Sequence, residues 1–310
     1  MHRVFALVTG MAAAAPALAA SLEVFHPAPG RGNFLATHGA SVPPHLAWTG
    51  GLVLDFADDL LLGPGGAKLV DSRLNVHTMG TVGLRNRGEV GLVVPFAVQR
   101  GIDQFEGASL GDVRLVPKLK LFWRGAPRRG FGGAFIPEVS FPSGDEKKAN
   151  GEAGVTAAPR LAIEGVLGRW DGALNLGYRI RKSSGSGPTE QDDELVVSAA
   201  VMRELPRGFE ALIESYGSLG TAVDSGFSQV AAPFEAMVAA RYVKLPWGLV
   251  VSLGGGVGIT KGTGASDLRV LAAVSYQRRP KPAPAKKKIA VEKKPPEPPP
   301  EEEPTDWELE

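Results

Sequence analysis

The sequence predicts a transmembrane β-barrel of about twelve antiparallel strands, and three observations predict it. Apolar and polar residues alternate at every second position, the connections alternate between long and short, and aromatic residues gather at particular strand ends. In a membrane-spanning barrel one face of each strand meets lipid and the other meets the lumen, so polarity follows the two-residue repeat of the strand. Connections are short on one side of the membrane and long on the cell-exterior side.

The first segment, residues 45–56, shows the alternation. One face carries Leu46, Trp48, Leu52, Leu54 and Phe56, and the other carries His45, Thr49, Gly51 and Asp55. Eleven further segments repeat the pattern, with apolar positions over 70–84, 90–98, 113–121, 131–141, 155–163, 170–180, 195–201, 209–213, 234–242, 247–257 and 268–276. The alternation is weakest in 195–201 and 209–213. Amphipathic helices would repeat their apolar residues at three- and four-residue spacing, which these segments do not.

The connections fall into two classes. Long, polar and Gly-rich connections are expected at 57–67, 99–111, 142–154, 182–193, 217–232 and 258–266. Short ones are expected near 85–88, 123–130, 165–169, 203–208 and 244–247. An even number of strands puts both chain ends on the side of the short turns, which in an outer membrane is the periplasm.

Aromatic residues support the same topology. Seven of them open or close strands on the predicted periplasmic rim, where they would form an interfacial girdle: Trp48, Phe131, Trp170, Phe209, Tyr242, Trp247 and Tyr276. Three others, Phe56, Phe141 and Tyr178, would mark the outer rim. A soluble sandwich has no reason to place aromatic residues in this way.

The polar faces of the strands predict a charged lumen. Its candidate lining residues are Asp71, Arg73, His77, Asp112, Arg114, Lys118, Lys120, Glu138, Arg160, Glu164, Arg179, Arg181 and Arg241. Charges inside a barrel either line a water-filled channel or pair across the lumen and close it. The mixed signs favour pairing, whereas Arg114, Lys118 and Lys120 form a local basic stripe, so both interpretations stay open. For an open lumen we predict a narrow pore with a mild anion preference.

The chain divides into four parts. Residues 1–20 are predicted to be a signal peptide, because His2 and Arg3 precede an apolar run and Ala17–Ala19 form a small-residue cleavage site. Residues 21–44 are expected to be a periplasmic lead-in, and 45–277 the barrel. No other run reaches the roughly 18 apolar residues expected of a spanning helix.

Residues 278–310 form a tail rich in Pro, Lys and Glu. Such a composition does not build a core and favours an extended, semi-rigid polyproline II spacer. The simplest expectation is a solvated periplasmic tail. The alternative is a tail that contacts peptidoglycan or a periplasmic protein, with Trp307 as an anchor.

The composition excludes several classes of function. The chain contains no cysteine, which excludes disulfides, thiolate metal sites and a lipidated N-terminal cysteine. A net charge of +1, from 34 basic and 33 acidic residues, offers no field for nucleic acid. We predict lipid of the outer membrane as a partner, and no cofactor or metal, since no His/Asp/Glu cluster has metal-ligand spacing.

Catalysis is not expected. His77 is the only histidine deep within a strand, but no G-x-S-x-G elbow accompanies it and its position points inward. An enzymatic function would require hydrolase activity that is lost in His77→Ala. The Gly254–Gly258 run with Lys261 fits neither the phosphate-loop nor the dinucleotide-binding spacing.

Two stretches resemble outer-membrane barrels of known families. The run Pro137-Glu138-Val139-Ser140-Phe141-Pro142-Ser143-Gly144-Asp145 is similar to a strand-end motif of MetA-like transporters of phenol degradation. Residues 25–30 and 273–277, with the Pro/Lys linker, resemble the barrel half of myxobacterial OmpA-family proteins. The latter resemblance implies a peptidoglycan-binding domain after the linker, which this sequence does not contain.

Together these features predict an outer-membrane barrel, porin-like or transporter-like, for the passive passage of small solutes. The alternative is a structural barrel with a closed lumen whose tail contacts the cell wall or a partner protein. The sequence does not indicate a solute.

Overall fold

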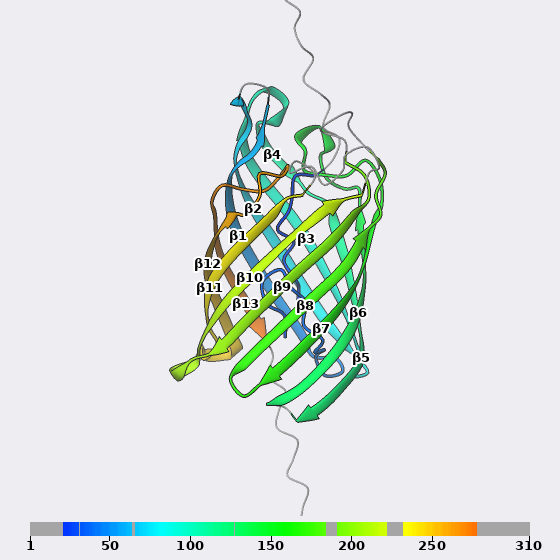
Figure 1. The fold of residues 1–310 in the computed structure, drawn as a ribbon, viewed down its shortest axis with the longest axis vertical. Coiled ribbons are helices and arrows are strands. Elements are labelled where there is room, and N and C mark those ends of the chain that lie inside the picture. Colours follow the sequence, from blue (N-terminus) through cyan, green and yellow to red (C-terminus); the bar gives the residue numbers. More distant parts are fainter. Residues whose placement is uncertain are drawn as a thin grey trace, which may run out of the picture. The chain divides into compact units, whose positions relative to one another are not determined.

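Strand pairing closes the sheet into a ring. The computed structural model describes residues 21–30, 32–63, 66–126, 128–183, 191–221 and 232–277. Its strands are β1 (Trp48–Leu62), β2 (Lys68–Leu84), β3 (Gly88–Gly101), β4 (Gly107–Leu110), β5 (Val113–Ala126), β6 (Arg129–Phe141), β7 (Thr156–Leu167), β8 (Trp170–Arg179), β9 (Glu194–Glu204), β10 (Phe209–Gly220), β11 (Phe234–Tyr242), β12 (Leu249–Gly258) and β13 (Arg269–Gln277). All neighbours are antiparallel, and β1 pairs with both β2 and β13 (Figure 1).

Twelve of these strands form the barrel wall, and the short β4 pairs only with β3 at the barrel end. The predicted all-β barrel is therefore confirmed, and each of the twelve alternating segments corresponds to one wall strand. The predicted signal peptide (1–20) and the tail (278–310) lie outside the described residues.

The alternation sorts side chains between the two faces of the wall, as predicted. On the outer face Leu161, Ile213 and Val238 are 53%, 64% and 61% exposed, whereas the inward Asp55 and His77 are fully buried. Exposed apolar surface costs about 25 cal/mol per Å² in water, so a continuous apolar exterior suits contact with lipid. Within the described residues, no helix has the length and apolar character needed to cross a bilayer.

The first long connection is shorter than predicted. Residues 57–62 belong to β1, and only 63–67 connect it to β2. The β1–β2 register shifts between Asp58 and Leu61, and Asp59 adopts a positive φ of 50°. This bulge interrupts the two-residue repeat, and for that reason the alternation did not reveal the end of the strand.

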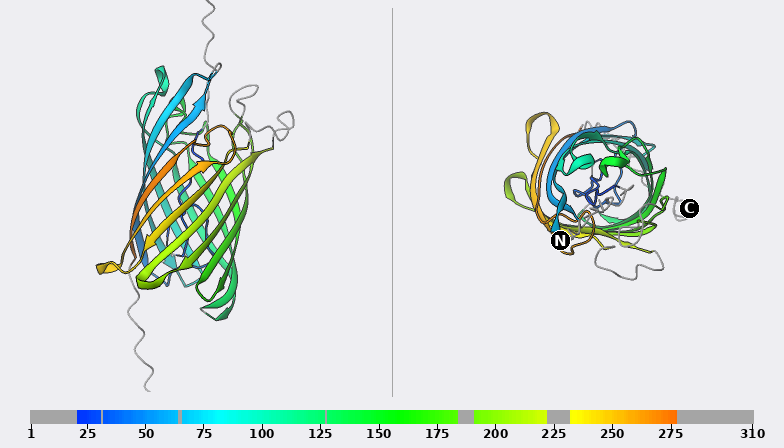
Figure 2. Two further views of the ribbon diagram at one scale, coloured as in Figure 1. Left: turned by 60° about the vertical axis from the view of Figure 1, so that its left-hand side comes forward. Right: turned by 90° about the horizontal axis from the view of Figure 1, so that it is seen from above.

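Two of the long connections, after β3 and after β6, turn inward at their end of the barrel. The connection after β3 contains the 3₁₀ turn η2 (Asp103–Phe105) and β4, and the connection after β6 contains η3 (Glu146–Lys148). The view along the barrel shows both turns over the opening (Figure 2). The opposite end carries tight turns, including η5 (Pro206–Gly208) and η7 (Pro246–Gly248).

The residues before β1 run through the lumen. We call residues 21–30 and 32–45 the internal segment; in Figure 2 it lies in blue inside the ring. At the long-loop end, the Leu22 N–H donates to the Ala149 carbonyl at 3.1 Å. At the short-turn end, the His45 N–H donates to Asn86 Oδ1 at 2.7 Å.

This position differs from the predicted periplasmic lead-in at residues 21–44. The first strand does begin at the short-turn end, but the chain reaches it from the opposite end of the barrel. Residues of the segment such as Phe25, Thr37 and Ala40 are almost fully buried. The alternation describes only residues in the wall, so it carried no information about a segment that the wall encloses.

Candidate functional site

The candidate functional site is the lumen together with the internal segment that occupies it. The segment has no partner strand, so its backbone groups need other hydrogen-bond partners. Glu214 of β10 accepts hydrogen bonds from three consecutive backbone N–H groups. The Leu35 N–H lies 3.0 Å and the Ala36 N–H 2.9 Å from its carboxylate, and the Thr37 N–H also donates to it. One carboxylate thus holds a whole turn of the segment.

Two further side chains hold the next residues. Glu164 of β7 accepts from the N–H groups of Ala40 at 2.5 Å and Ser41 at 3.1 Å. Asn175 of β8 pairs with both backbone groups of His38, accepting from N–H at 2.7 Å and donating to the carbonyl at 2.8 Å. The amide therefore substitutes for the missing neighbouring strand.

Cationic side chains bind acceptor groups of the same stretch. Arg241 of β11 donates to the carbonyls of Asn33 at 3.3 Å and Phe34 at 3.1 Å. Lys118 of β5 donates to Asn33 Oδ1 at 2.6 Å. Hydrogen bonds with one charged partner are stronger than neutral ones. We call residues 33–41 the clamped stretch, because charged or amide side chains from five strands bind it.

One side of the lumen is apolar. Residues of the segment and of β1, β10, β11 and β13 form a buried cluster, whose members are Phe25, Leu35, Ala36, Val53, Tyr216, Met237 and Leu271. The Phe25 and Tyr216 rings lie 5.6 Å apart, and Phe25 also faces the His77 ring at 6.1 Å. Packing and clamping therefore act on the segment together.

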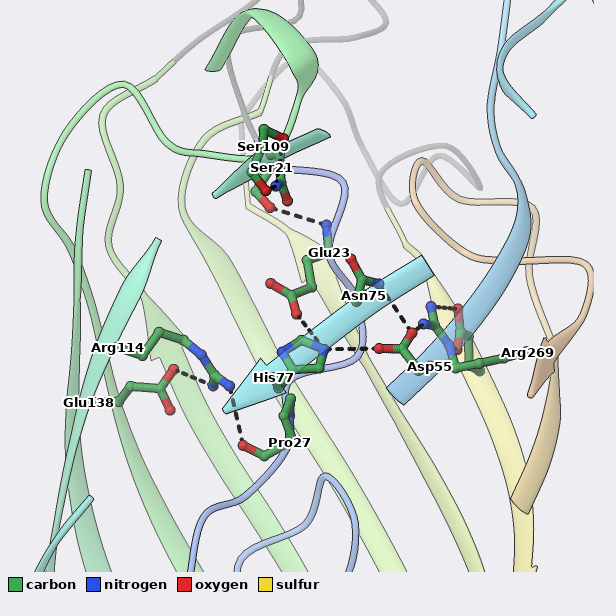
Figure 3. A network of polar contacts seen from close by, with 12 residues as sticks. Ser21, Glu23, Pro27, Asp55, Asn75, His77, Ser109, Arg114, Glu138 and Arg269 are labelled. Atoms are coloured by element: carbon green, nitrogen blue, oxygen red, sulfur yellow. Dashed lines mark hydrogen bonds and ion pairs between the residues drawn. The ribbon is translucent and has the colours of Figure 1, made fainter. Parts of the chain in front are cut away.

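An acidic cluster lies beside this apolar contact. It contains Glu23, Asp55, His77 and Arg269, which Figure 3 shows, together with Glu235, which pairs with Arg269. Arg269 binds Glu235 through two nitrogens at 2.7 and 2.9 Å and also pairs with Asp55. His77 Nε2 lies 2.9 Å from Asp55 and 3.4 Å from Glu23 of the internal segment. Three carboxylates thus share one guanidinium and one imidazole.

A basic cluster lies on the wall formed by β5–β9. It contains Arg114, Arg160, Arg179 and Arg181 with the carboxylates of Glu138, Glu152 and Glu194. Arg114 and Arg160 both contact Glu138, at 3.3 and 3.4 Å. Arg179 and Arg181 each lie 3.0 Å from Glu194, and Arg181 also lies 3.3 Å from Glu152. Arg114 additionally donates to the Pro27 carbonyl at 3.2 Å.

The long-loop end of the lumen is covered by its own contacts. Arg73 donates to Gln99 at 2.9 Å and to the Ala149 carbonyl at 3.0 Å, and Gln99 donates to the Phe105 and Lys148 carbonyls. A cluster of buried apolar side chains lies at the same end of the barrel, and its members are Leu22, Ala57, Leu60, Leu61, Val70, Phe105 and Ala149. The internal segment and the connections therefore meet in one cap.

Asp112 anchors the connection after β6 to this cap. Its carboxylate accepts from the N–H groups of Gly144 at 2.9 Å and Glu152 at 2.8 Å. Burial raises the pKa of Asp112 to about 6, although these two hydrogen bonds act in the opposite direction. The loop therefore depends on a carboxyl group that titrates at mildly acidic pH.

The predicted lumen residues fall into two groups. Those that are buried inside the barrel are Arg73, His77, Arg114, Lys118, Glu138, Arg160, Glu164 and Arg181. Those of intermediate exposure are Asp71, Asp112, Lys120, Arg179 and Arg241. Among these, Asp71 lies next to Lys68 at 3.1 Å near the strand end, with its side chain 48% exposed.

Several residues of the lumen were not singled out from the sequence. Glu214 and Asn175 bind the internal segment, Arg269 lies over the Phe25 ring, and Glu235 pairs with Arg269. All four lie at inward positions of the alternation. Nothing in that pattern distinguishes them from other polar inward residues. Only the contact with residues about 180 positions earlier in the chain identifies Glu214 as a clamp.

All seven predicted girdle aromatics lie at the short-turn end. Trp48 contacts Tyr276 with ring centroids 4.9 Å apart, and Phe209 contacts Tyr242 at 4.8 Å. Arg203 lies 4.9 Å from the Trp170 ring. Trp247, in η7, is 83% exposed. Phe131 lies near the start of β6, at the same barrel end.

The described residues contain no group of three or more His, Cys, Asp or Glu side chains that could hold a metal ion. The His77 ring contacts two carboxylates, and its Nδ1 atom has no hydrogen-bond partner. This arrangement orients an imidazole but supplies it with no hydroxyl nucleophile.

Solved structures with a similar fold include an outer-membrane channel and a porin. An outer membrane channel from Pseudomonas putida F1 matches with a TM-score of 0.56 and 14% identity over 76% of this chain and 97% of that chain. The NanC porin matches with a TM-score of 0.50 and 9% identity over 74% of this chain and all of the porin chain (100%). No protein-family model and no curated protein sequence matches this chain.

The fold and these likenesses define the class as a closed, twelve-stranded barrel of the outer-membrane type. At such low identity the likeness extends to the barrel architecture alone. The features that distinguish this chain lie in the contacts of its own lumen.

Proposed function

We propose that the protein is an outer-membrane channel for the passive passage of small solutes, with a lumen narrowed by the internal segment. The observation that carries this proposal is the contrast between an apolar exterior and an interior lined by ionisable side chains. A barrel that served only as a membrane anchor would not need buried charges, which cost several kcal/mol each when they are imperfectly paired.

The distribution of hydrogen bonds along the internal segment favours a segment of which only one part moves. The clamped stretch is bound by many hydrogen bonds, whereas in the described part of the chain the cap joins the segment through one backbone hydrogen bond, between Leu22 and Ala149, and through the apolar packing of Leu22. Passage would therefore begin with release of the cap at the long-loop end. The residues below it would remain bound to the wall.

Single-channel recording of the full chain in planar bilayers tests the proposal. We expect discrete conductance steps that decrease when a Leu22→Cys/Ala149→Cys pair is oxidised and recover with reductant. Because the chain has no cysteine, the two single variants are matched controls. If oxidation of the cysteine pair leaves the conductance unchanged, solutes pass beside an internal segment that does not move. The absence of any conductance in the wild type would refute passage.

That last outcome would favour a structural barrel with a closed lumen. The specific observation in favour of this alternative is the internal segment, which spans the lumen from Leu22 at one end to His45 at the other. In that case deletion of the gene should weaken the cell envelope without any defect in solute uptake.

We further propose that the short turns and the girdle aromatics face the periplasm, so that the cap faces the cell exterior. The tail, residues 278–310, would then extend into the periplasm and contact peptidoglycan or a periplasmic protein. Crosslinking with and without these residues tests the contact, and identical crosslinking patterns would reject it.

We also propose a relationship to MetA-like transporters and OmpA-family barrels. It is supported by the position of the 137–145 motif, which ends β6 and leads directly into the inward-turning connection with η3. An uptake assay with phenol in cells with and without the protein tests the MetA-like relationship, and equal uptake would argue against it.

A further inference from the structure

Among the described residues, the four arginine side chains of the basic cluster form ion pairs with three carboxylates. Arg179 and Arg181 face two carboxylates, Glu194 and Glu152. Arg114 and Arg160 face only one, Glu138. The side chains of Arg114 and Arg160 are only 3% and 5% exposed. Two buried guanidinium groups that share one carboxylate leave one positive charge without a counter-charge of its own, which is unfavourable, so an additional anion would be stabilised here.

The cluster also has hydrogen-bond donors without partners. Within the part of the chain that the structure describes, the buried Nε–H groups of Arg114, Arg160 and Arg181 have no acceptor, and neither ring nitrogen of His26 has a partner, of which one is a donor in the neutral imidazole. Two carboxylate oxygens of the cluster, Glu138 Oε2 and Glu152 Oε2, also accept no hydrogen bond. His26 belongs to the internal segment and directly precedes Pro27, whose carbonyl accepts a hydrogen bond from Arg114 at 3.2 Å. Each buried donor without an acceptor costs about 1–3 kcal/mol. Water could satisfy these donors, but water supplies no negative charge.

The cluster lies near the long-loop end, above the clamped stretch. Arg179 is the last residue of β8, and Arg114 is the second residue of β5, which begins at the same end. Figure 3 shows the Arg114–Glu138 pair beside the Pro27 carbonyl of the internal segment. A solute that enters at this end therefore meets the cluster before it meets residues 33–41.

We propose that Arg114 and Arg160, with His26 beside them, form a binding site for the carboxylate of a small organic anion. This inference rests on the proposed channel function and names its class of solute. A carboxylate has two oxygens with about four acceptor positions, which suits several convergent N–H donors. It also supplies the missing negative charge. Because a charged acceptor outcompetes a neutral one, the bound carboxylate weakens the Arg114 contact with the Pro27 carbonyl.

Calorimetric titration of the detergent-solubilised full chain with benzoate tests the site without requiring conductance. We expect benzoate to bind and its neutral analogue benzamide not to bind. Arg160→Gln, which removes the excess charge, should weaken benzoate binding at least tenfold. Arg160→Lys, which keeps the charge but loses the planar fork, should give an intermediate affinity. Arg128→Gln is the control, because Arg128 is 74% exposed at the opposite end.

Heat-modifiable migration on gels confirms that each variant forms a folded barrel. Equal binding of benzoate and benzamide, unchanged affinity in Arg160→Gln, or no benzoate binding to the wild type would overturn the proposed site. Benzoate binding without conductance would keep the site and reject passage. Conductance without benzoate binding would keep the channel and reject the site.

Discussion

The two halves of the internal segment are held by different chemistry. The clamped stretch, residues 33–41, gives its backbone N–H groups to Glu214 and Glu164 and both groups of His38 to Asn175. The upper half, residues 22–30, instead meets ionisable groups that are imperfectly paired, such as Glu23 beside His77 and Asp55. Inward side chains of the barrel therefore fix residues 33–41 through complete hydrogen bonds, whereas beside residues 22–30 they leave charges imperfectly paired. A ligand or a change in charge should act on the upper half first.

The largest loss of stability is expected from Glu214→Ala, which removes the main hydrogen-bond acceptor of the more strongly held half, the clamped stretch. It leaves the N–H groups of Leu35, Ala36 and Thr37 without their acceptor, at a cost of about 3 kcal/mol or more. The barrel should lose its heat-resistant gel migration at a lower temperature, and channel conductance should rise. Glu204→Ala is a suitable control, because the Glu204 side chain is 49% exposed at the short-turn end. Equal stability of both variants would show that the clamp is not important.

A smaller effect is expected from Glu23→Gln in the upper half. Glu23 Oε1 is buried without a hydrogen-bond partner and shares His77 Nε2 with Asp55. Removing its charge loses a weak contact and relieves repulsion between two carboxylates, so the net change should stay within about 1 kcal/mol. The thermal gel shift used for Glu214→Ala measures it. A loss as large as that of Glu214→Ala would contradict the proposed difference between the halves.

The smallest effect concerns pH at the cap. Because burial raises the pKa of Asp112 to about 6, the folded state binds the carboxyl proton more tightly than the unfolded state does. This contribution is complete below the ordinary Asp pKa and is lost as the pH rises through about 6. Limited proteolysis should therefore cleave the 142–154 connection more slowly at about pH 5 than at about pH 7. Asp112→Asn should remove this pH dependence of cleavage. If the pH dependence persists in this variant, another ionisable group causes it.

The wall of the barrel was predictable because its signal is local. In an alternating strand each side chain reveals its own face, and Leu161, Ile213 and Val238 indeed lie outside. The alternation became unreliable where the backbone breaks the two-residue repeat, as at the bulge near Asp58. It also failed after the register shift between Lys120 and Phe122, where β5 ends at Ala126 and β6 begins at Arg129, inside the connection predicted at 123–130. It also placed Asp55 and His77 on the inward face, although it could not show that they contact each other.

The contents of the lumen were not predictable in this way. Residues 21–44 have no partner strand and no repeat, so the sequence offered no reason to distinguish a periplasmic lead-in from a segment inside the barrel. Their position depends on acceptors such as Glu164 and Glu214, which lie more than 120 residues away in the chain. The even strand count predicts both chain ends on the side of the short turns; the first strand begins at that end, but the residues before it run through the lumen.

The amino-acid order alone therefore established a closed wall with lipid outside and charge inside, because a pleated strand exposes successive side chains to opposite surroundings. Folding in three dimensions determined that the chain fills its own interior and that two arginines share one carboxylate. Those features arise from contacts between distant residues, which no short repeat in a sequence can encode.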